Sequence, residues 1–287
     1  MMTTGFRLQR VQPITALNLN VEEYEHSSGA KHYHLSNDYE ENVFMVALRT
    51  VPEDSRGAAH ILEHTALCGS EKFPVRDPFF SMIRRSLNTF MNAFTTSDYT
   101  AYPFASQNRK DYFNLMEVYL DAVFFARLDP RDFAQEGHRV EFEDASNLSS
   151  PLIYKGIVYN EMKGATSSPI SQLYHRVQAE LYPTSTYHYN SGGDPLDIPD
   201  LTHEDLIDFY RSHYHPSNAV FMTFGNISAI DQQNKIAEFA LDRFDLNSVP
   251  EIRVRAEQRY SSPVNAAFQY PLDDDDLDGK THIVLAW

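Results

Sequence analysis

Segments that favour strands and segments that favour helices alternate irregularly along this chain of 287 residues. Runs rich in β-branched and aromatic residues predict strands, and apolar residues at helical spacing predict helices. The alternation follows no strict strand–helix–strand repeat, which indicates an α+β fold: a two-layer domain with helices packed on a mostly antiparallel sheet. Strands are predicted at residues 31–35, where regular structure is expected to begin, and at 43–50, 92–103 and 218–224; helices are predicted at 57–68, 79–87, 111–127, 156–163, 170–181, 201–213 and 229–244.

The character of the chain changes after residue 244. Residues 249–265 are polar and interrupted by proline, and the acidic run at 273–276 is typical of a solvated linker. Residues 281–287 have the pattern of a buried strand that stops at the last residue. We therefore expect an N-terminal domain at 1–255, an interdomain linker at 256–280 and the first strand of a truncated second domain at 281–287. The chain would then be the N-terminal part of a longer protein.

Charge and cysteine content limit the partners and the compartment. The net charge of −16 argues against nucleic acid as a partner, because phosphate binding needs concentrated Lys and Arg. The acidity indicates either a solvated acidic surface or an acidic cavity that attracts basic peptides. No stretch reaches the ~18 apolar residues of a membrane span, so no membrane partner is expected. The single cysteine, Cys68, fits a reducing compartment and favours a cytoplasmic address, with a processed organellar form as the alternative.

The most informative motif is His-x-x-Glu-His at residues 60–64, inside a predicted helix. Residues four apart lie on the same face of a helix, and the residue three along is adjacent. His60 and His64 could therefore bind one Zn²⁺ through imidazole nitrogens. Glu63 would lie beside the open position of the metal, where a carboxylate can take a proton from water. The alternative is that both histidines are capping or partly buried polar residues.

A catalytic zinc needs a third protein ligand, and the candidate is Glu161. It lies in the apolar stretch 156–164, where an unpaired carboxylate would be costly. Metal ligation would remove that cost. A salt bridge or a place at a helix N-terminus would also remove it, so the spacing alone leaves these alternatives open.

Other candidate ligands favour structural roles. His32 with His34, and His213 with His215, form pairs that have no carboxylate at ligand spacing. Cys68 follows His64 by four residues and could touch zinc or respond to oxidation. A buried packing thiol is the favoured interpretation.

Several stretches outside the motif resemble the inverzincin family of peptidases (the pitrilysin and insulin-degrading type), and most closely its presequence-protease branch. The likeness covers most of the chain, from about residue 6 to residue 287. It is carried by residues 60–71, by Leu-Asn-Thr-Phe-Met-Asn-Ala-Phe-Thr at 87–95, by Asn-Glu-Met-Lys-Gly at 160–164, by Ser-Gly-Gly-Asp-Pro at 191–195 and by His-Tyr-His-Pro-Ser-Asn-Ala at 213–219.

The resemblance implies roles for the motif residues. His60, His64 and Glu161 would be the zinc ligands, and Glu63 the general base. Many members carry a second Glu seven residues before the ligand Glu, where this chain has Tyr154. That difference puts in doubt whether the role of this second carboxylate carries over to the present chain. A matching segment at 135–139 is expected to be structural.

The resemblance also implies how substrates bind. Asn92 and Ala93 would lie on an edge strand that pairs with an extended peptide. The family is built from four related α+β domains in two halves, which close around a chamber that admits unfolded peptides. An Arg and a Tyr that stabilise the transition state come from the second half, which this chain lacks.

We therefore expect a zinc-dependent metalloendopeptidase that degrades unfolded peptides, basic ones among them, with Zn²⁺ as cofactor. The missing C-terminal half is an expected partner, and this part alone is expected to be inactive. The alternative is a non-catalytic relative used for peptide binding or assembly. Because all four motif residues are present, the enzyme is favoured; the edge-strand segment disfavours a zinc hydrolase of non-peptide substrates.

Overall fold

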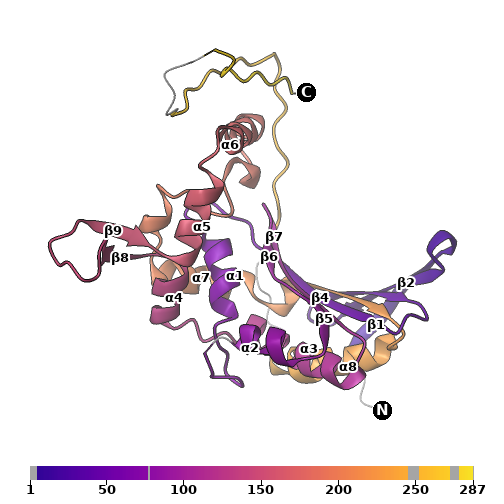
Figure 1. Cartoon of the computed structure of the whole chain (residues 1–287). Helices are drawn as coiled ribbons and strands as arrows, with labels where there is room; N and C mark the ends of the chain where they lie inside the picture. The colour runs from indigo at the N-terminus through magenta and orange to yellow at the C-terminus, as the bar shows by residue number, and fades with distance from the viewer. Residues whose placement is uncertain (1–4, 77, 245–251, 272–277, 287) are drawn as a thin grey trace.

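A single large sheet forms the centre of the molecule (Figure 1). The computed structural model describes residues 5–76, 78–244, 252–271 and 278–286. The strand order is β1-β2-β3-β10-β4-β7-β5, and β6 also pairs with β7. Within the described residues β3 and β10 pair in parallel and the other neighbours are antiparallel. The strands are β1 Phe6–Ile14, β2 Leu19–His26, β3 Lys31–Ser36, β4 Asn42–Arg49, β5 Asn88–Met91, β6 Phe94–Thr95, β7 Tyr99–Ser106, β8 Arg139–Phe142, β9 Leu152–Lys155 and β10 Ala219–Gly225.

Helices cover one side of the sheet and gather beyond one of its ends. Helices α3 and α8 lie beneath the sheet, whereas α1, α4, α5 and α7 form a group next to β6 and β7 (Figure 1). The predicted α+β fold, with helices on a mostly antiparallel sheet, is confirmed. The α-helices are α1 Ala58–Ala66, α2 Pro78–Arg85, α3 Arg109–Phe124, α4 Pro130–Glu136, α5 Ile157–Ala165, α6 Pro169–Leu181, α7 His203–His213 and α8 Ala229–Phe239, with short 3₁₀ turns at Thr15–Leu17, Thr186–His188, Ile198–Asp200, Pro216–Asn218 and Leu241–Arg243.

An aromatic cluster joins the sheet to α3. Phe104 of β7 packs against Tyr112 and Tyr119 of α3, with ring centroids 5.2 and 5.1 Å apart, and against Phe44 of β4 at 5.3 Å. All four side chains are buried. Burying a side chain of this size contributes about 1.5–3 kcal/mol. The cluster therefore anchors β7, the strand on which β5 and β6 are built.

A capping box begins α7, and an ion pair joins this end of α7 to the residue before α1. The Thr202 hydroxyl accepts a hydrogen bond from the Asp205 backbone N–H at 3.1 Å, and the Asp205 carboxylate accepts one from the Thr202 backbone N–H at 3.0 Å. Asp205 also pairs with Arg56, just before α1, at 2.8 Å. Since α1 carries the His-x-x-Glu-His motif, these contacts help to fix its orientation.

The N-terminal hairpin corrects the expectation that regular structure begins at residue 31. Strands β1 and β2 precede that residue and extend the sheet on the β3 side. Seven of the nine residues of β1 are exposed, and its alternation of apolar and polar residues is interrupted where Gln9 and Arg10 stand together at a register shift. Its pairing with β2 supplies the structure that its sequence pattern does not indicate.

The C-terminal segment corrects a second expectation. Residues 281–286 are exposed and belong to no strand, so the buried strand predicted there is wrong for this chain. A strand needs a neighbour to satisfy its backbone hydrogen bonds, and no neighbour pairs with this segment among the described residues. The acidic run at 273–276 lies outside the described residues. Residues 256–271 contain neither helix nor strand, which fits a linker; the domain boundaries themselves stay a prediction.

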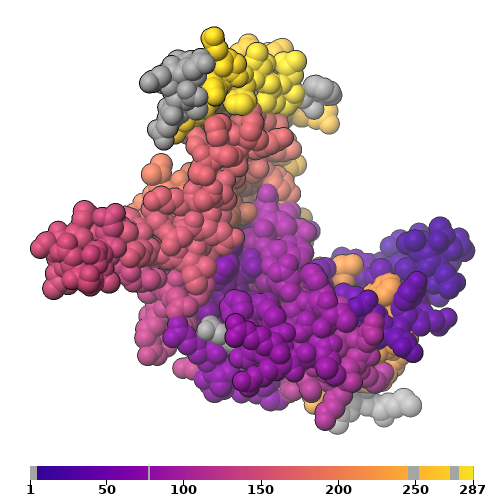
Figure 2. All heavy atoms as spheres, viewed as in Figure 1, coloured from indigo at the N-terminus to yellow at the C-terminus, as the bar shows by residue number. Residues whose placement is uncertain are grey.

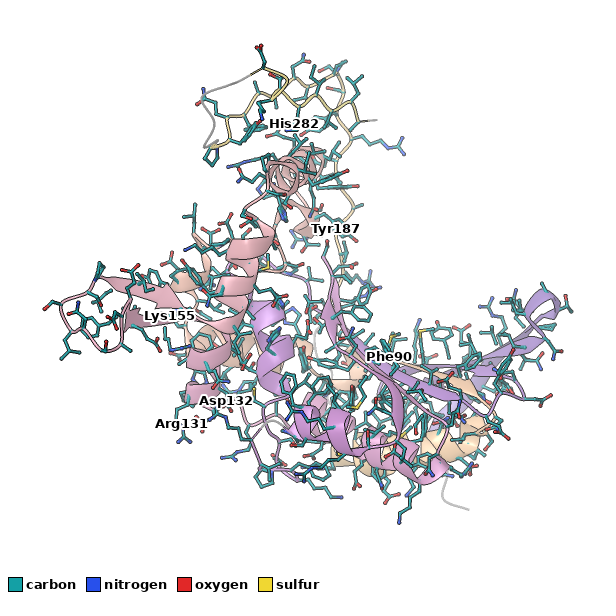
Figure 3. The ribbon with its side chains drawn as sticks, viewed as in Figure 1. Phe90, Arg131, Asp132, Lys155, Tyr187 and His282 are labelled. Carbon is teal, nitrogen blue, oxygen red and sulfur yellow. The ribbon has the colours of Figure 1, made fainter. Side chains whose placement is uncertain are left out.

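Two elements stand out from the body of the molecule. The hairpin of β8 and β9, with Lys155 where it joins the body, projects sideways, and α6 projects upwards (Figures 1, 2 and 3). No residue of α6 is buried. None of the described helices combines the length and the apolar character that crossing a membrane would require.

Candidate metal centre

Helix α1 places His60 and His64 on one face, with ring centroids 5.1 Å apart. The helix begins after Gly57, whose φ of +75° lies in the left-handed region. A Cβ at this position would lie 3.0 Å from the Gly192 carbonyl oxygen and 3.0 Å from the Gly193 Cα. Glycine is therefore needed for the beginning of α1 to approach the loop at 190–195. The opposite face of α1, with Ile61 and Leu62, is buried in the core.

Helix α5 brings Glu161 to the two histidines. One Glu161 carboxylate oxygen, Oε2, lies 3.8 Å from His60 Nε2 and 3.9 Å from His64 Nε2. One ligand atom from each of the three residues lies within 4.8 Å of the others. Among the described residues this is the one group of three or more His, Cys, Asp or Glu side chains with such spacing. The structure thus brings together the three ligands predicted from the sequence.

Glu161 is more exposed than its apolar stretch of sequence predicts. Its side chain is 54% exposed, so the cost of burying an unpaired carboxylate does not explain its position. The apolar residues Val158 and Met162 of α5 are buried, and Glu161 lies at the exposed margin of that buried face. Convergence with the two histidines is the stronger support for Glu161.

Each histidine is held through its Nδ1 atom. His60 Nδ1 lies 3.0 Å from the Gly192 carbonyl oxygen, and His64 Nδ1 lies 3.1 Å from Glu136 Oε2. A carbonyl or carboxylate oxygen can only accept a hydrogen bond, so in both rings Nδ1 carries the proton. In a neutral imidazole the Nε2 atom is then free of a proton, and both Nε2 atoms face Glu161. This is the tautomer that a metal-binding histidine needs.

Glu136, at the end of α4, is the residue of this site that the sequence interpretation missed. It is 6% exposed, and the segment 135–139 had been assigned a structural role. In the structure Glu136 is the carboxylate that contacts the ring of His64. Burial lowers the pKa of His64, but the hydrogen bond to Glu136 and the charges of Glu63, Glu136 and Glu161 outweigh it and raise the pKa. The sequence carries no spacing signal for Glu136, because it lies 72 residues from His64 and meets it only in the folded chain.

The donor set fits Zn²⁺. Two imidazole nitrogens and one carboxylate oxygen converge, and both imidazoles have the outer hydrogen-bond partner typical of zinc ligands. Three protein ligands leave a fourth position for water, which distinguishes a catalytic zinc site from a structural one. No thiolate belongs to the group, so its donors are those of a site with two His and one carboxylate, a set known for catalytic zinc.

Glu63 lies beside the ligands without joining them. Its side chain is 7% exposed, and its Oε2 atom accepts a hydrogen bond from the Thr95 hydroxyl at 2.7 Å. Glu63 does not belong to the group of converging ligand atoms. A carboxylate that is next to a metal but not bound to it can accept a proton from water. The geometry is therefore compatible with the general base predicted from the motif.

Asn92 and Ala93 connect β5 to β6 at the edge of the sheet, because the strand order ends at β5. The Asn92 backbone N–H donates to the Pro103 carbonyl of β7 at 3.1 Å, so this part of the chain is aligned along β7. Phe90 of β5, labelled in Figure 3, is half exposed. The predicted edge position is thus present, and the role of Asn92 and Ala93 in substrate binding stays a prediction.

The other sequence candidates lie away from the ligand group. His32 and His34 are buried, and each has a ring nitrogen 2.8 Å from the Thr223 hydroxyl. This placement fits the structural roles predicted for them. Cys68 is buried and its thiol donates to the His64 carbonyl oxygen at 3.4 Å, beyond the end of α1. The contact involves only the backbone of His64, so Cys68 does not occupy the His64 ring nitrogens.

Comparison with protein families gives two matches. A family profile described as insulinase (peptidase family M16) matches residues 49–166. A second, described as peptidase M16 inactive domain, matches residues 200–287. His60, Glu63, His64, Glu136 and Glu161 all lie inside the first match.

Individual relatives give the same result. The chain is 50% identical over 260 residues to the mitochondrial presequence protease of Xenopus tropicalis. The matched residues are 90% of this chain and 25% of the relative. It is 50% identical over 241 residues to that of Mus musculus (84% and 23%) and 48% identical over 234 residues to that of Schizosaccharomyces pombe (81% and 24%). The chain therefore spans about a quarter of the length of these relatives.

A solved structure agrees on the fold. The crystal structure of a protease from Helicobacter pylori matches 80% of this chain and 52% of that chain with a TM-score of 0.63. Its sequence identity of 19% limits this likeness to the fold. The two family matches and the presequence-protease relatives together show that the chain belongs to the insulinase family of peptidases, M16, in its presequence-protease branch.

Proposed function

We propose that the protein containing this chain is a zinc metalloendopeptidase that degrades unfolded peptides, and that this chain supplies its zinc site and its general base. The observation that carries the proposal is the convergence of two histidine Nε2 atoms and one carboxylate oxygen next to a buried carboxylate that is not a ligand. Membership of a peptidase family supports the same reaction class.

In the proposed mechanism His60, His64 and Glu161 hold the metal. A bound zinc ion would polarise the scissile carbonyl and lower the pKa of a water molecule. Glu63 accepts the proton of the attacking water and returns it to the leaving amine. Glu136 and the Gly192 carbonyl keep both imidazole rings in the tautomer that presents Nε2.

The proposed substrate is an extended peptide. A peptide can add to the sheet edge at Asn92 and Ala93 by backbone hydrogen bonding, which requires that the peptide be unfolded. The net charge of −16 supports a preference for basic peptides. The names of the relatives specify presequences and mitochondria. Mitochondrial targeting sequences are rich in Arg and poor in acidic residues, so we propose presequence-like substrates and a processed organellar form in place of the cytoplasmic address favoured by the sequence.

The relatives are about four times as long as this chain, which supports the proposal that a second half completes the enzyme. That half would close the chamber and supply the Arg and Tyr that stabilise the transition state. The zinc site on this chain would then activate water without the full set of groups that catalysis needs.

The test is Glu63→Gln in the intact protein. Gln is nearly isosteric but cannot accept the proton, so turnover of a quenched-fluorescence peptide should fall by about 10²–10⁴-fold or more while zinc content stays at one per chain. Turnover close to that of the unaltered protein would show that Glu63 is not the base. Loss of zinc would make Glu63 a ligand. If the unaltered zinc-loaded protein cleaves no peptide, the non-catalytic alternative holds.

A further inference from the structure

Three threonine hydroxyls form a hydrogen-bonded line that ends on Glu63. The Thr50 and Thr100 hydroxyls are 2.9 Å apart, the Thr100 and Thr95 hydroxyls are 3.2 Å apart, and Thr95 Oγ1 lies 2.7 Å from Glu63 Oε2. Thr50 and Thr100 are fully buried. The three threonines belong to three segments: Thr50 directly follows β4, Thr100 lies at the beginning of β7, and Thr95 lies in β6.

The chemistry of the end group gives this line one direction. An ionised carboxylate only accepts hydrogen bonds, whereas a hydroxyl has a single proton to donate. Thr95 therefore donates its proton to Glu63 and can only accept from Thr100, and Thr100 in turn accepts from Thr50. Hydrogen bonds that share a direction polarise one another, so the donor that meets the carboxylate is strengthened by those behind it.

Thr95 also joins two parts of the site. It lies in β6, directly after the edge positions Asn92 and Ala93, and β6 packs against α1. Among the described residues, Thr95 is the donor that holds the Glu63 side chain, through Oε2. The other oxygen, Oε1, has no hydrogen-bond partner in that part of the chain. The strand at the sheet edge thus carries the hydroxyl that orients the buried carboxylate.

We propose that Thr95 is a positioning residue for the reaction: it holds Glu63 Oε2, so that Oε1 faces the water from which a proton is taken. This inference rests on the proposed function of Glu63. Thr95 touches neither substrate nor metal, and it acts through Glu63 alone. A defect at Thr95 should therefore lower the rate of the chemical step and leave peptide binding and zinc binding unchanged.

The experiment compares variants of the intact, zinc-loaded protein. Thr95→Val removes the hydroxyl at nearly constant shape, Thr95→Ser keeps it, and Thr96→Val is the matched control, because the Thr96 hydroxyl donates to the Tyr99 carbonyl at 3.1 Å and does not contact Glu63. A hydrogen bond to a charged group is strong enough that Thr95→Val should lower kcat by about 10–100-fold. KM should stay within about twofold, because the lost contact acts in the transition state and not in peptide binding.

Recovery by the conservative variant separates positioning from packing. Thr95→Ser should keep kcat within about threefold of the unaltered protein, and Thr96→Val should match it, since both retain the bond to Glu63. Zinc content should stay at one per chain in all three variants. If Thr95→Val fails to fold, as shown by loss of its thermal transition, Thr95→Ala carries the same prediction.

Two results would overturn the inference. The first is unchanged kcat in Thr95→Val while Glu63→Gln is inactive, which would leave the proposed function intact and remove only the role of Thr95. The second is a raised KM at constant kcat, which would make Thr95 part of peptide binding. An active Glu63→Gln would be a failure of the proposed function itself and would remove the inference with it.

Discussion

Removal of Glu136 should weaken zinc binding although Glu136 does not touch the metal. Its Oε2 atom accepts from His64 Nδ1 at 3.1 Å, its Oε1 atom accepts from Gln135 at 3.0 Å, and its side chain is buried. In Glu136→Ala the His64 ring loses both the acceptor that fixes its tautomer and the negative charge that makes Nε2 a better ligand. Loss of such an outer partner typically lowers metal affinity about 10–100-fold, or about 1.4–2.8 kcal/mol.

The assay is a competition titration of the intact protein against a zinc indicator of known affinity. Glu136→Gln, which keeps an acceptor oxygen and loses the charge, should fall between the unaltered protein and Glu136→Ala. Glu141→Ala is the control, because Glu141 has the same charge but pairs with Arg139 and Lys155 on the β8–β9 hairpin. Zinc affinity of a folded Glu136→Ala within about twofold of the unaltered protein would refute the reasoning from outer-shell hydrogen bonds.

Two further predictions concern stability and activity. Burial, with the charge of His34, lowers the pKa of His32 to about 3, so between pH 6.5 and 3 the unfolded chain binds a proton that the folded chain does not, and stability falls as pH falls. In urea unfolding with a chelator, the free energy of unfolding should decrease between pH 7 and pH 5 by about 2 kcal/mol less in His32→Gln than in the unaltered protein. The same decrease in both proteins would contradict the lowered pKa of His32. Residues 1–287 alone should bind zinc and unfold cooperatively but cleave peptides at least about 10²-fold more slowly than the intact protein, because oxyanion donors are missing. Full peptidase activity of this part would contradict the proposal of two halves.

The sequence predicted those parts of the fold whose signals are local. Helices such as α3, predicted at 111–127 and observed at Arg109–Phe124, carry their apolar periodicity in adjacent residues. Strands β1 and β2 were missed because the apolar alternation of β1 is interrupted and most of its residues are exposed. Their place in the sheet comes from the pairing of β1 with β2 and of β2 with β3. The strand predicted at 281–287 failed for the opposite reason: it has an apolar pattern but no neighbouring strand in the described chain.

The candidate site divides in the same way. His60, Glu63 and His64 share one helix, so their spacing alone predicts their geometry. Glu136 lies 72 residues from its partner His64, and Gly192 lies 132 residues from its partner His60. No spacing rule links such distant residues, so their contacts depend on how α4 and the loop at 190–195 pack against α1. Glu161 was predicted first from its place in an apolar stretch and then from the family resemblance; the first reason was wrong, because the side chain is 54% exposed.

Anomalous diffraction at the zinc absorption edge tests the central claim most directly. Crystals of the protein grown with zinc should show one strong anomalous peak per chain. It should lie about 2.0–2.2 Å from His60 Nε2, His64 Nε2 and a Glu161 carboxylate oxygen, with Glu63 outside bonding distance. A peak at other residues, or zinc bound by Glu63 in place of Glu161, would contradict the account.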